Sequence, residues 1–171
     1  MQTWDVIRSR RNVRSYEDRP ISEDDLERVL EAARRTPSSS NEQRWDFVVV
    51  RDKDRLERLS HVWRGAAHIP GSAATIALIA PEADDPRVRE SIAYDLGQVT
   101  MSIMLGAADL GIGTGHSAAR DQEVARDVLG FPDGYYCAWL IGLGYPADRP
   151  LKPIEKPSRR PFEDVVHHEQ W

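Results

Sequence analysis

The stretch PRVRESIAYDLGQVTMSIMLGAADL, residues 86–110, decides the fold because it is the longest helical pattern in the chain. Its apolar residues fall on two stripes at helical spacing, Val88, Ile92, Leu96, Val99, Ile103 and Leu110 on one and Met101, Met104, Leu105 and Ala108 on the other. A helix that is apolar nearly all round has to be buried on both sides. A chain of 171 residues has little to place on the second side. The pattern therefore predicts a long buried helix at a subunit interface, and hence a homodimer.

Short apolar runs flank this helical segment on both sides. Residues 75–80 form a continuous apolar run that Pro81 ends, which is typical of a strand covered on both faces. Residues 47–50 and 137–141 have the same character, and a helix capped by Ser22 precedes them. We expect an α+β fold in which helices flank a mixed central β-sheet. The length predicts a single domain over residues 1–171.

The composition changes after residue 145. Five of the 11 prolines lie in this last part, at Pro146, Pro150, Pro153, Pro157 and Pro161. This spacing is too dense for a helix or a central strand. We expect an extended C-terminal arm over residues 145–171, which lies along a neighbour or over a site.

The overall charge and the cysteine content exclude several classes of function. Lys and Arg total 23 against 28 for Asp and Glu, and a formal net charge of -5 argues against a general nucleic-acid binder. No apolar run approaches the roughly 20 residues that span a bilayer, and the first residues lack the order of a secretory signal, so we expect a cytoplasmic protein that does not contact membranes. One cysteine, Cys137, excludes a disulfide framework, and its apolar strand indicates a core thiol rather than a nucleophile. We also expect no metal site, because His167 and His168 have no acidic or cysteine companion at ligand spacing.

Two basic clusters are candidates for binding phosphate. Arg10, Arg11, Asn12 and Arg14 combine guanidinium forks with a short polar side chain, which suits the oxygens of a phosphate monoester. Arg159 and Arg160 form a second cluster in the arm. Each cluster alone could equally be a solvated face, and the phosphate hypothesis gains if the two meet in space.

The loop at residues 37–45 is a candidate site for a flat heterocycle. It offers short donors and acceptors on Ser38, Ser39, Asn41 and Gln43 beside Trp45, although an ordinary helix-to-strand loop could look similar. Glycines at 111, 113 and 115 do not match a dinucleotide fingerprint, because a helix rather than a strand precedes them. They favour a tight turn after the long helix that brings amide groups close to a ligand.

Taken together, the motifs resemble those of the FMN-dependent nitroreductase family over nearly the whole chain. Residues 10–16 (RRNVRSY) are similar to the family's N-terminal arginine segment, and residues 37–47 (PSSSNEQRWDF) are similar to its Pro-Ser-Ser-x-Asn-x-Gln-Pro-Trp-x-Phe loop. Further matches follow in the family's order: Asp95-Leu96-Gly97, residues 107–113, residues 129–132, residues 143–146 and residues 159–162. Asn12 and Arg44 depart from the usual Ser and Pro. The resemblance implies a sandwich-like α+β fold and a dimer with two FMN molecules at its interface.

The resemblance also implies a division of the FMN contacts between two subunits. In one subunit, Arg10, Arg11, Asn12 and Arg14 would hold the phosphate, ribityl and pyrimidine side of FMN, with further phosphate charge from Arg159 and the neighbouring Arg160. The other subunit would contribute Pro37, Ser38, Ser39, Asn41 and the nearby Gln43. The backbone at Ser117, Ala118 and Ala119 corresponds to the segment beside flavin N5.

The implied activity is electron transfer from NADH or NADPH through flavin N5 to a nitroaromatic, a quinone or another small electron-poor acceptor in a ping-pong cycle. The protein would then need no catalytic dyad, because the flavin carries the chemistry and Arg14 would stabilise negative charge on the reduced ring. The short sequence between about residues 63 and 90 offers little for a substrate lid. Two alternatives remain: a flavin-sequestering protein with little turnover, and a specialised flavin dehalogenase or oxidase of the same fold. Use of a deazaflavin in place of FMN also stays open.

Overall fold

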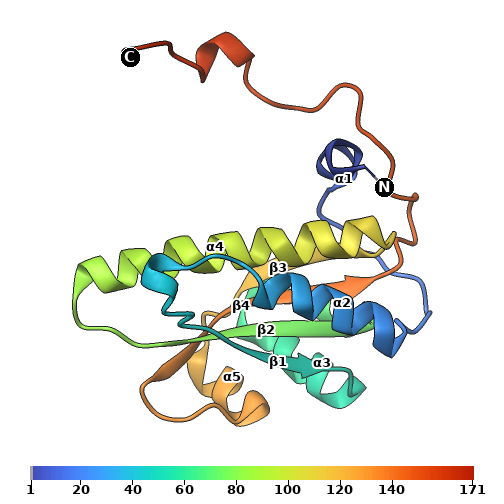
Figure 1. Cartoon of the computed structure of the whole chain (residues 1–171). Helices are drawn as coiled ribbons and strands as arrows, with labels where there is room; N and C mark the ends of the chain where they lie inside the picture. The colour runs from blue at the N-terminus through green and yellow to red at the C-terminus, as the bar shows by residue number, and fades with distance from the viewer. Residues whose placement is uncertain (1) are drawn as a thin grey trace.

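The computed structural model describes residues 2–171 and shows helices on both sides of a central sheet (Figure 1). The helices and strands are, in chain order, α1 (Thr3–Ser9), α2 (Glu23–Arg34), β1 (Asp46–Val50), α3 (Lys53–Leu59), β2 (Ala74–Pro81), α4 (Pro86–Asp109), β3 (Gly113–Ala118), α5 (Gln122–Leu129) and β4 (Tyr135–Gly144). Short 3₁₀ turns lie at Ser39–Asn41, Ser60–Val62, Arg64–Ala66, Ile69–Gly71 and Phe162–Asp164. The predicted long helix is confirmed by α4.

The sheet has four strands in the order β1-β2-β4-β3. All three strand pairings are antiparallel, and parallel pairing is limited to an isolated bridge between Asn12 and Thr114. The expected α+β architecture is confirmed. The sheet itself is antiparallel rather than mixed, apart from this one parallel bridge. The apolar run at residues 75–80 indicated burial on both faces, and a central antiparallel strand covered by helices is as apolar as a parallel one.

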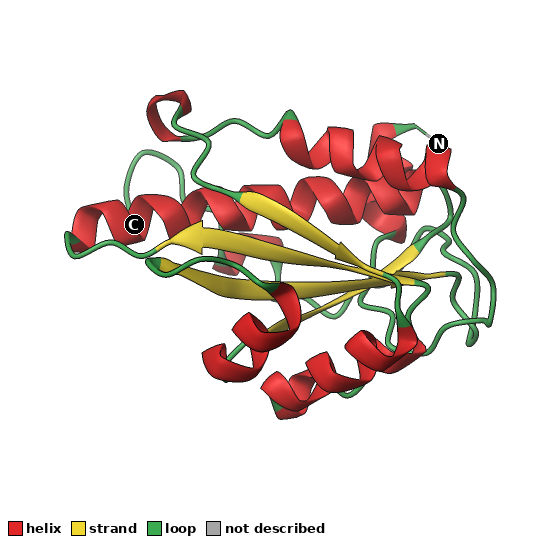
Figure 2. Cartoon of the chain, turned by 90° about the horizontal axis from the view of Figure 1, so that it is seen from below, coloured by secondary structure: helices red, strands yellow, loops and turns green. Residues whose placement is uncertain are grey.

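Two hydrophobic layers cover the sheet, as the side views show (Figures 1 and 2). Helices α2 and α4 pack on one face, where Ile76, Leu78 and Ile141 meet Leu96 and Val99. Helices α3 and α5 pack on the other face, around Cys137 and Leu140. Burial raises the pKa of the Cys137 thiol to about 12, so this thiol is inert core, as its apolar strand predicted.

Side-chain caps explain where the helices begin. Ser22 Oγ accepts a hydrogen bond from the Asp25 amide at 3.1 Å at the start of α2. Asp52, Asp85 and Asp121 cap α3, α4 and α5 in the same way. Helix α5 ends at Gly130, whose φ of 74° is the left-handed conformation that glycine adopts without strain.

Over residues 93–101, helix α4 is covered on one side only within the chain. Ile92, Leu96 and Val99 are buried against the sheet, whereas Tyr94 and Met101 on the outer side are 70% and 44% exposed. Ala93 and Gly97 are also exposed, and Leu105 is half-buried. Of the second apolar stripe of the sequence, Met101 is exposed and Leu105 is half-buried, whereas Met104 and Ala108 are buried within the chain.

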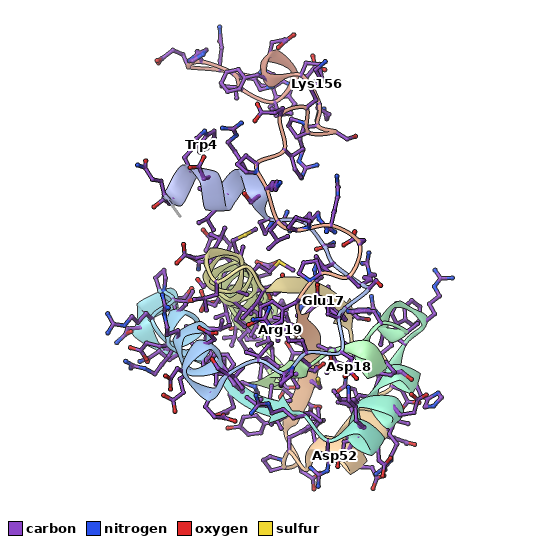
Figure 3. The ribbon with its side chains drawn as sticks, turned by 90° about the vertical axis from the view of Figure 1, so that its right-hand side faces the viewer. Trp4, Glu17, Asp18, Arg19, Asp52 and Lys156 are labelled. Carbon is purple, nitrogen blue, oxygen red and sulfur yellow. The ribbon has the colours of Figure 1, made fainter. Side chains whose placement is uncertain are left out.

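Helix α1 and the C-terminal arm stand on this open side of α4. The arm is fastened to α1 by a hydrogen bond from the Ile154 amide to the Arg8 carbonyl at 3.1 Å and by an ion pair between Arg8 and Glu155 at 2.7 Å. Beyond these contacts it runs away from the body, as the positions of Trp4 on α1 and Lys156 on the arm show in Figure 3. The arm lacks strands, and Phe162–Asp164 forms a 3₁₀ turn. Within residues 2–171, no helix is long and apolar enough to cross a lipid bilayer.

Candidate functional site

The arginine segment runs along the outer edge of β3. The Val13 amide donates to the Thr114 carbonyl at 2.8 Å, and Val13 is buried while Asn12 and Arg14 point to solvent. This packing requires a glycine at position 113, because a Cβ there would lie 2.6 Å from the Val13 side chain. The pairing with β3 thus sends alternate side chains of the segment outward.

The three arginines of this segment have different partners. Arg10 Nη1 donates to the Met104 sulfur of α4 at 3.7 Å. Arg11 forms an ion pair with Asp148 at 2.7 Å and donates to the Arg149 carbonyl, and its hydrogen bond lowers the pKa of Asp148. Arg14 is exposed and makes no ion pair with any described residue. Arg11 therefore fastens the arm, which leaves Arg10 and Arg14 as the guanidinium groups of the segment that can bind a ligand.

The structure brings one arginine of each predicted basic cluster into a common groove. Arg10 and Arg159 both line a groove of about 670 Å³ between α1, α4 and the arm. Its other walls are largely apolar and include Trp4, Met101 and Ile154. Arg160 is not among the lining residues, and its Nη2 donates to the Asp164 carbonyl within the arm. Of the predicted pair in the arm, only Arg159 joins the arginine segment.

The outer edge of β3 offers main-chain donors beside these arginines. The Thr114 carbonyl points outward to Val13, and because backbone direction alternates along a strand, the backbone groups of His116 and Ala118 share that edge. Ser117 faces the other way, and its hydroxyl donates to the Ala118 carbonyl at 3.1 Å. Of the predicted 117–119 segment, the amide of Ala118 can therefore face a ligand, whereas the Ser117 side chain cannot.

Sequence reasoning gave no role to His116, which lies at this edge. Its Nδ1 atom is buried without a hydrogen-bond partner among the described residues, and its ring meets Trp139 edge-on at 5.5 Å. Burial first, and then the charges of Arg14 and Arg10, lower its pKa. An unpaired ring nitrogen in a positive field suits an electron-rich acceptor or an anion. Strand alternation after Gly115 was the signal that could have placed His116 here.

A second histidine supports the same strand from behind. His68 is buried, with Nδ1 at 3.1 Å from the Gly65 carbonyl and Nε2 at 3.0 Å from the Gly115 carbonyl. A neutral imidazole carries one N–H and can donate to only one of these two acceptors. Burial lowers the pKa of His68, which favours this neutral form. A Cβ at position 115 would lie 2.3 Å from the Val13 carbonyl, so only glycine lets β3 fit between His68 and Val13.

The polar loop at residues 37–45 is held in an unusual backbone conformation. Ser40, Asn41 and Gln43 have φ values of 52°, 56° and 51°. These values lie in the left-handed region, which residues other than glycine seldom adopt. Asp95 of α4 fixes the loop, because it accepts hydrogen bonds from the Ser39 amide at 3.1 Å and from Ser39 Oγ at 3.2 Å. Such strain persists only where surrounding contacts enforce it, and it concentrates at functional sites. In this structure, Asp95 therefore positions the loop.

The loop and the arginine segment lie at different places along α4. The loop contacts α4 at Asp95 and Arg10 contacts it at Met104. Nine residues of α-helix separate these anchors, which corresponds to about 13 Å along the axis. Within one chain, the loop half and the arginine half of the expected cofactor site are therefore anchored at different points of α4.

Comparisons with known proteins agree with this geometry. A profile of the nitroreductase family matches residues 7–76, which contain the arginine segment and the polar loop. A protein of Archaeoglobus fulgidus, provisionally named an NADH dehydrogenase/NAD(P)H nitroreductase, is 33% identical over 97% of this chain and 97% of its own length. The chain belongs to the nitroreductase family. It is accordingly an oxidoreductase, and both the expected fold class and the family resemblance are confirmed.

Two further nitroreductase relatives match over most of this chain. The FMN reductase [NAD(P)H] of Bacillus subtilis is 27% identical and covers 98% of this chain and 74% of its own length. The solved FMN-dependent nitroreductase from Clostridium difficile R20291 superposes with a TM-score of 0.84 at 24% identity, over 97% and 98% of the two chains, and so shares the fold. Within residues 2–171 of this family member, no three His, Cys, Asp or Glu side chains gather as metal ligands would.

Proposed function

We propose that this nitroreductase is a homodimeric FMN enzyme that moves electrons from NADH or NADPH to a small electron-poor acceptor, nitroaromatic or quinone-like, in two half-reactions at one site. The separation of the two polar clusters along α4 carries this proposal. Each chain holds one basic half and one loop half, about 13 Å apart along a helix whose outer side is open. A second copy packed on that side supplies the missing half of each site.

The described residues fit FMN at both ends of the molecule. Arg10 and Arg159 share a groove and would bind the phosphate with charge-assisted hydrogen bonds. Asn12 and Arg14 would contact the ribityl chain and the pyrimidine ring, and the partner's loop would add Pro37, Ser38, Ser39, Asn41 and Gln43. The name of the Bacillus subtilis relative, an FMN reductase that uses NAD(P)H, supports this choice of cofactor and electron donor.

When bound, FMN supplies two-electron chemistry at N5, accepting a hydride from a nicotinamide and returning electrons to the acceptor. The chain's own residues then position and tune the ring rather than donate protons. Arg14 would place positive charge beside the pyrimidine, where the reduced ring becomes negative. The amide of Ala118 shares the outer edge of β3 with the Thr114 carbonyl, where the ring heteroatoms would need partners.

The exposed side of α4 supports the homodimer. Ala93 and Gly97 are small enough for close approach of a second helix, and Tyr94, Met101 and Leu105 supply apolar area. Trp4 and Ile7 of α1 continue this surface at 66% and 46% exposure. Apolar surface of this extent is typical of a protein interface.

The test is the visible absorbance spectrum of the purified protein before and after anaerobic addition of NADH and then NADPH. Flavin bands that bleach with either donor, in a protein of dimeric mass by light scattering, are the expected result. Bands that persist with both donors favour the flavin-sequestering alternative. A colourless protein that also fails to take up added FMN contradicts the cofactor assignment, and a monomeric mass contradicts the shared site.

A further inference from the structure

An exposed tryptophan lies between two arginines outside the cofactor contacts described above. Trp63 precedes the 3₁₀ turn Arg64–Ala66 and is 39% exposed. The guanidinium carbon of Arg64 lies 5.2 Å from its ring centroid, and that of Arg120 lies 5.8 Å from it. We call these three residues the Trp63 cluster. Both distances lie within the range of attraction between a cation and an aromatic face.

Neither arginine of the Trp63 cluster is neutralised by a carboxylate. Within residues 2–171, their contacts are those with the indole, whereas other surface arginines such as Arg58 and Arg126 pair with aspartates. The nearest acidic residue in sequence, Asp121, accepts a hydrogen bond from the Val124 amide as the cap of α5. In a chain of net charge -5, two guanidinium groups without a carboxylate partner beside one indole ring form a local site for an anion.

The Trp63 cluster adjoins the end of β3 that carries the proposed flavin edge. The amide of Arg120 donates to the Val62 carbonyl at 3.1 Å, which ties the two ends of the cluster together. A Cβ on Gly65 would lie 3.1 Å from Ser117 Oγ, so the turn packs directly on the strand. Arg120 also lines a cavity of about 420 Å³ together with Ala118 and Trp139. A ligand with one end at the β3 edge can therefore extend to the cluster.

We infer that the Trp63 cluster binds the 2′-phosphate and the adenine ring of NADPH and so makes NADPH the preferred electron donor. This inference rests on the proposed function, because it names the donor for the same site. The indole supplies a face on which an adenine stacks, and the two guanidinium groups supply the forked donors that match phosphate oxygens. NADH carries a hydroxyl in place of that phosphate, so it gains nothing from the two charges. The FMN phosphate has its own arginines in the groove between α1, α4 and the arm.

Calorimetric binding of adenosine 2′,5′-bisphosphate and of adenosine 5′-monophosphate to the flavin-loaded protein tests this inference without catalysis. The wild type should bind the bisphosphate at least about tenfold more tightly, since charge-assisted hydrogen bonds are the strong ones. Arg64→Ala and Arg120→Ala should each remove about tenfold of bisphosphate affinity and leave monophosphate binding unchanged. Arg55→Ala, which removes an exposed arginine of α3 without an ion pair, is the matched control.

The same variants are then compared by the rate of anaerobic flavin bleaching with NADPH and with NADH. The ratio of the two rates should fall at least about tenfold in Arg64→Ala and Arg120→Ala and stay constant in Arg55→Ala. Added salt should slow flavin bleaching by NADPH more than bleaching by NADH, because salt screens the attraction between exposed charges. Trp63→Ala should weaken the binding of both nucleotides, whereas Trp63→Phe, which keeps an aromatic face, should retain most of it.

Each result bears on one of the two proposals. Equal wild-type affinity for the two nucleotides, or an equal loss in Arg55→Ala, overturns the assignment of the Trp63 cluster. Failure of both donors to bleach the flavin overturns the proposed function, and the calorimetry still decides the cluster in that case. Bleaching by both donors with an unchanged ratio in the arginine variants overturns the inference alone.

Discussion

The division of each site between two chains can be tested by complementation. One variant, Arg10→Ala/Arg14→Ala, removes the basic half, and a second variant, Ser39→Ala/Asn41→Ala, removes the loop half. If a second copy completes each site, a heterodimer of the two variants contains one site with both defects and one site that is wholly intact. If each chain forms its own site, no intact site arises from mixing.

The structure gives the size of each defect. Two charge-assisted contacts at about 1.5–3 kcal/mol each make the loss in the arginine variant about 3–6 kcal/mol of FMN binding free energy. In the loop variant, two neutral hydrogen bonds and the poorer fit of alanine at the 56° φ of Asn41 sum to about 2–4 kcal/mol. Either value lowers affinity about 30-fold or more, so a suitable FMN concentration leaves both parent variants almost empty.

The assay is fluorescence quenching of FMN by the two variants alone and after co-refolding in equal amounts. Random pairing makes about half of the dimers heterodimers, and one of their two sites is intact, so about a quarter of the wild-type FMN content should return. Mixing of two wild-type samples through the same procedure controls for losses on refolding. Absence of recovery, in a mixture shown to contain heterodimers, would refute the shared site.

Three further predictions follow from single contacts. Asp95→Ala removes the hydrogen bonds that a buried carboxylate accepts from the loop serine, and we expect a loss of about 1.5–3 kcal/mol of unfolding free energy in chemical denaturation together with weaker FMN binding. Gly115→Ala places a Cβ 2.3 Å from the Val13 carbonyl and should lower the melting temperature strongly. At Gly97 a Cβ meets nothing within 4 Å, so Gly97→Ala should leave the melting temperature of the unassembled chain unchanged or raise it. Arg11→Ala should free the arm and increase amide hydrogen exchange over residues 147–155. Because Arg11 depresses the Asp148 pKa, the protection that it gives should be full above the ordinary aspartate pKa and be lost as the pH falls through the lowered value.

Helix positions and buried strands were predictable because each depends on a local pattern. Residues 86–109 repeat apolar side chains at helical spacing, and residues 75–80 are apolar throughout, so neither needed knowledge of a partner element. The direction in which the strands pair was harder to predict from the sequence, because it depends on how the connections between strands cross the sheet. The arginine segment was predictable as a group, but the diversion of Arg11 to the arm depends on Asp148, which lies 137 residues further along the chain.

The two site histidines show a different limit of sequence reasoning. His68 and His116 are 48 residues apart and belong to no spaced motif. Their roles follow from β3, where Gly115 lies against the His68 ring and His116 turns toward Trp139 on the other face. A strand alternation pattern assigns faces only once the strand is known to lie at an edge. The Trp63 cluster was missed for the same reason, because Arg120 reaches Trp63 only through the end of that strand.

The distribution of charge around β3 explains how an acidic protein can bind anionic cofactors. Within residues 2–171, nine arginines form ion pairs with aspartates or glutamates, and these contacts neutralise much of the surface locally. Arg10, Arg14, Arg64 and Arg120 are among the arginines that have no such partner among the described residues, and these four lie near one strand. Charges left unpaired in this way keep their field for a ligand. Burial first, and then the charge of Arg14, lower the pKa values of His68 and His116. The positive field therefore runs along β3 from the groove at α1 to the Trp63 cluster, which is the path that a bound flavin and an extended dinucleotide would have to share.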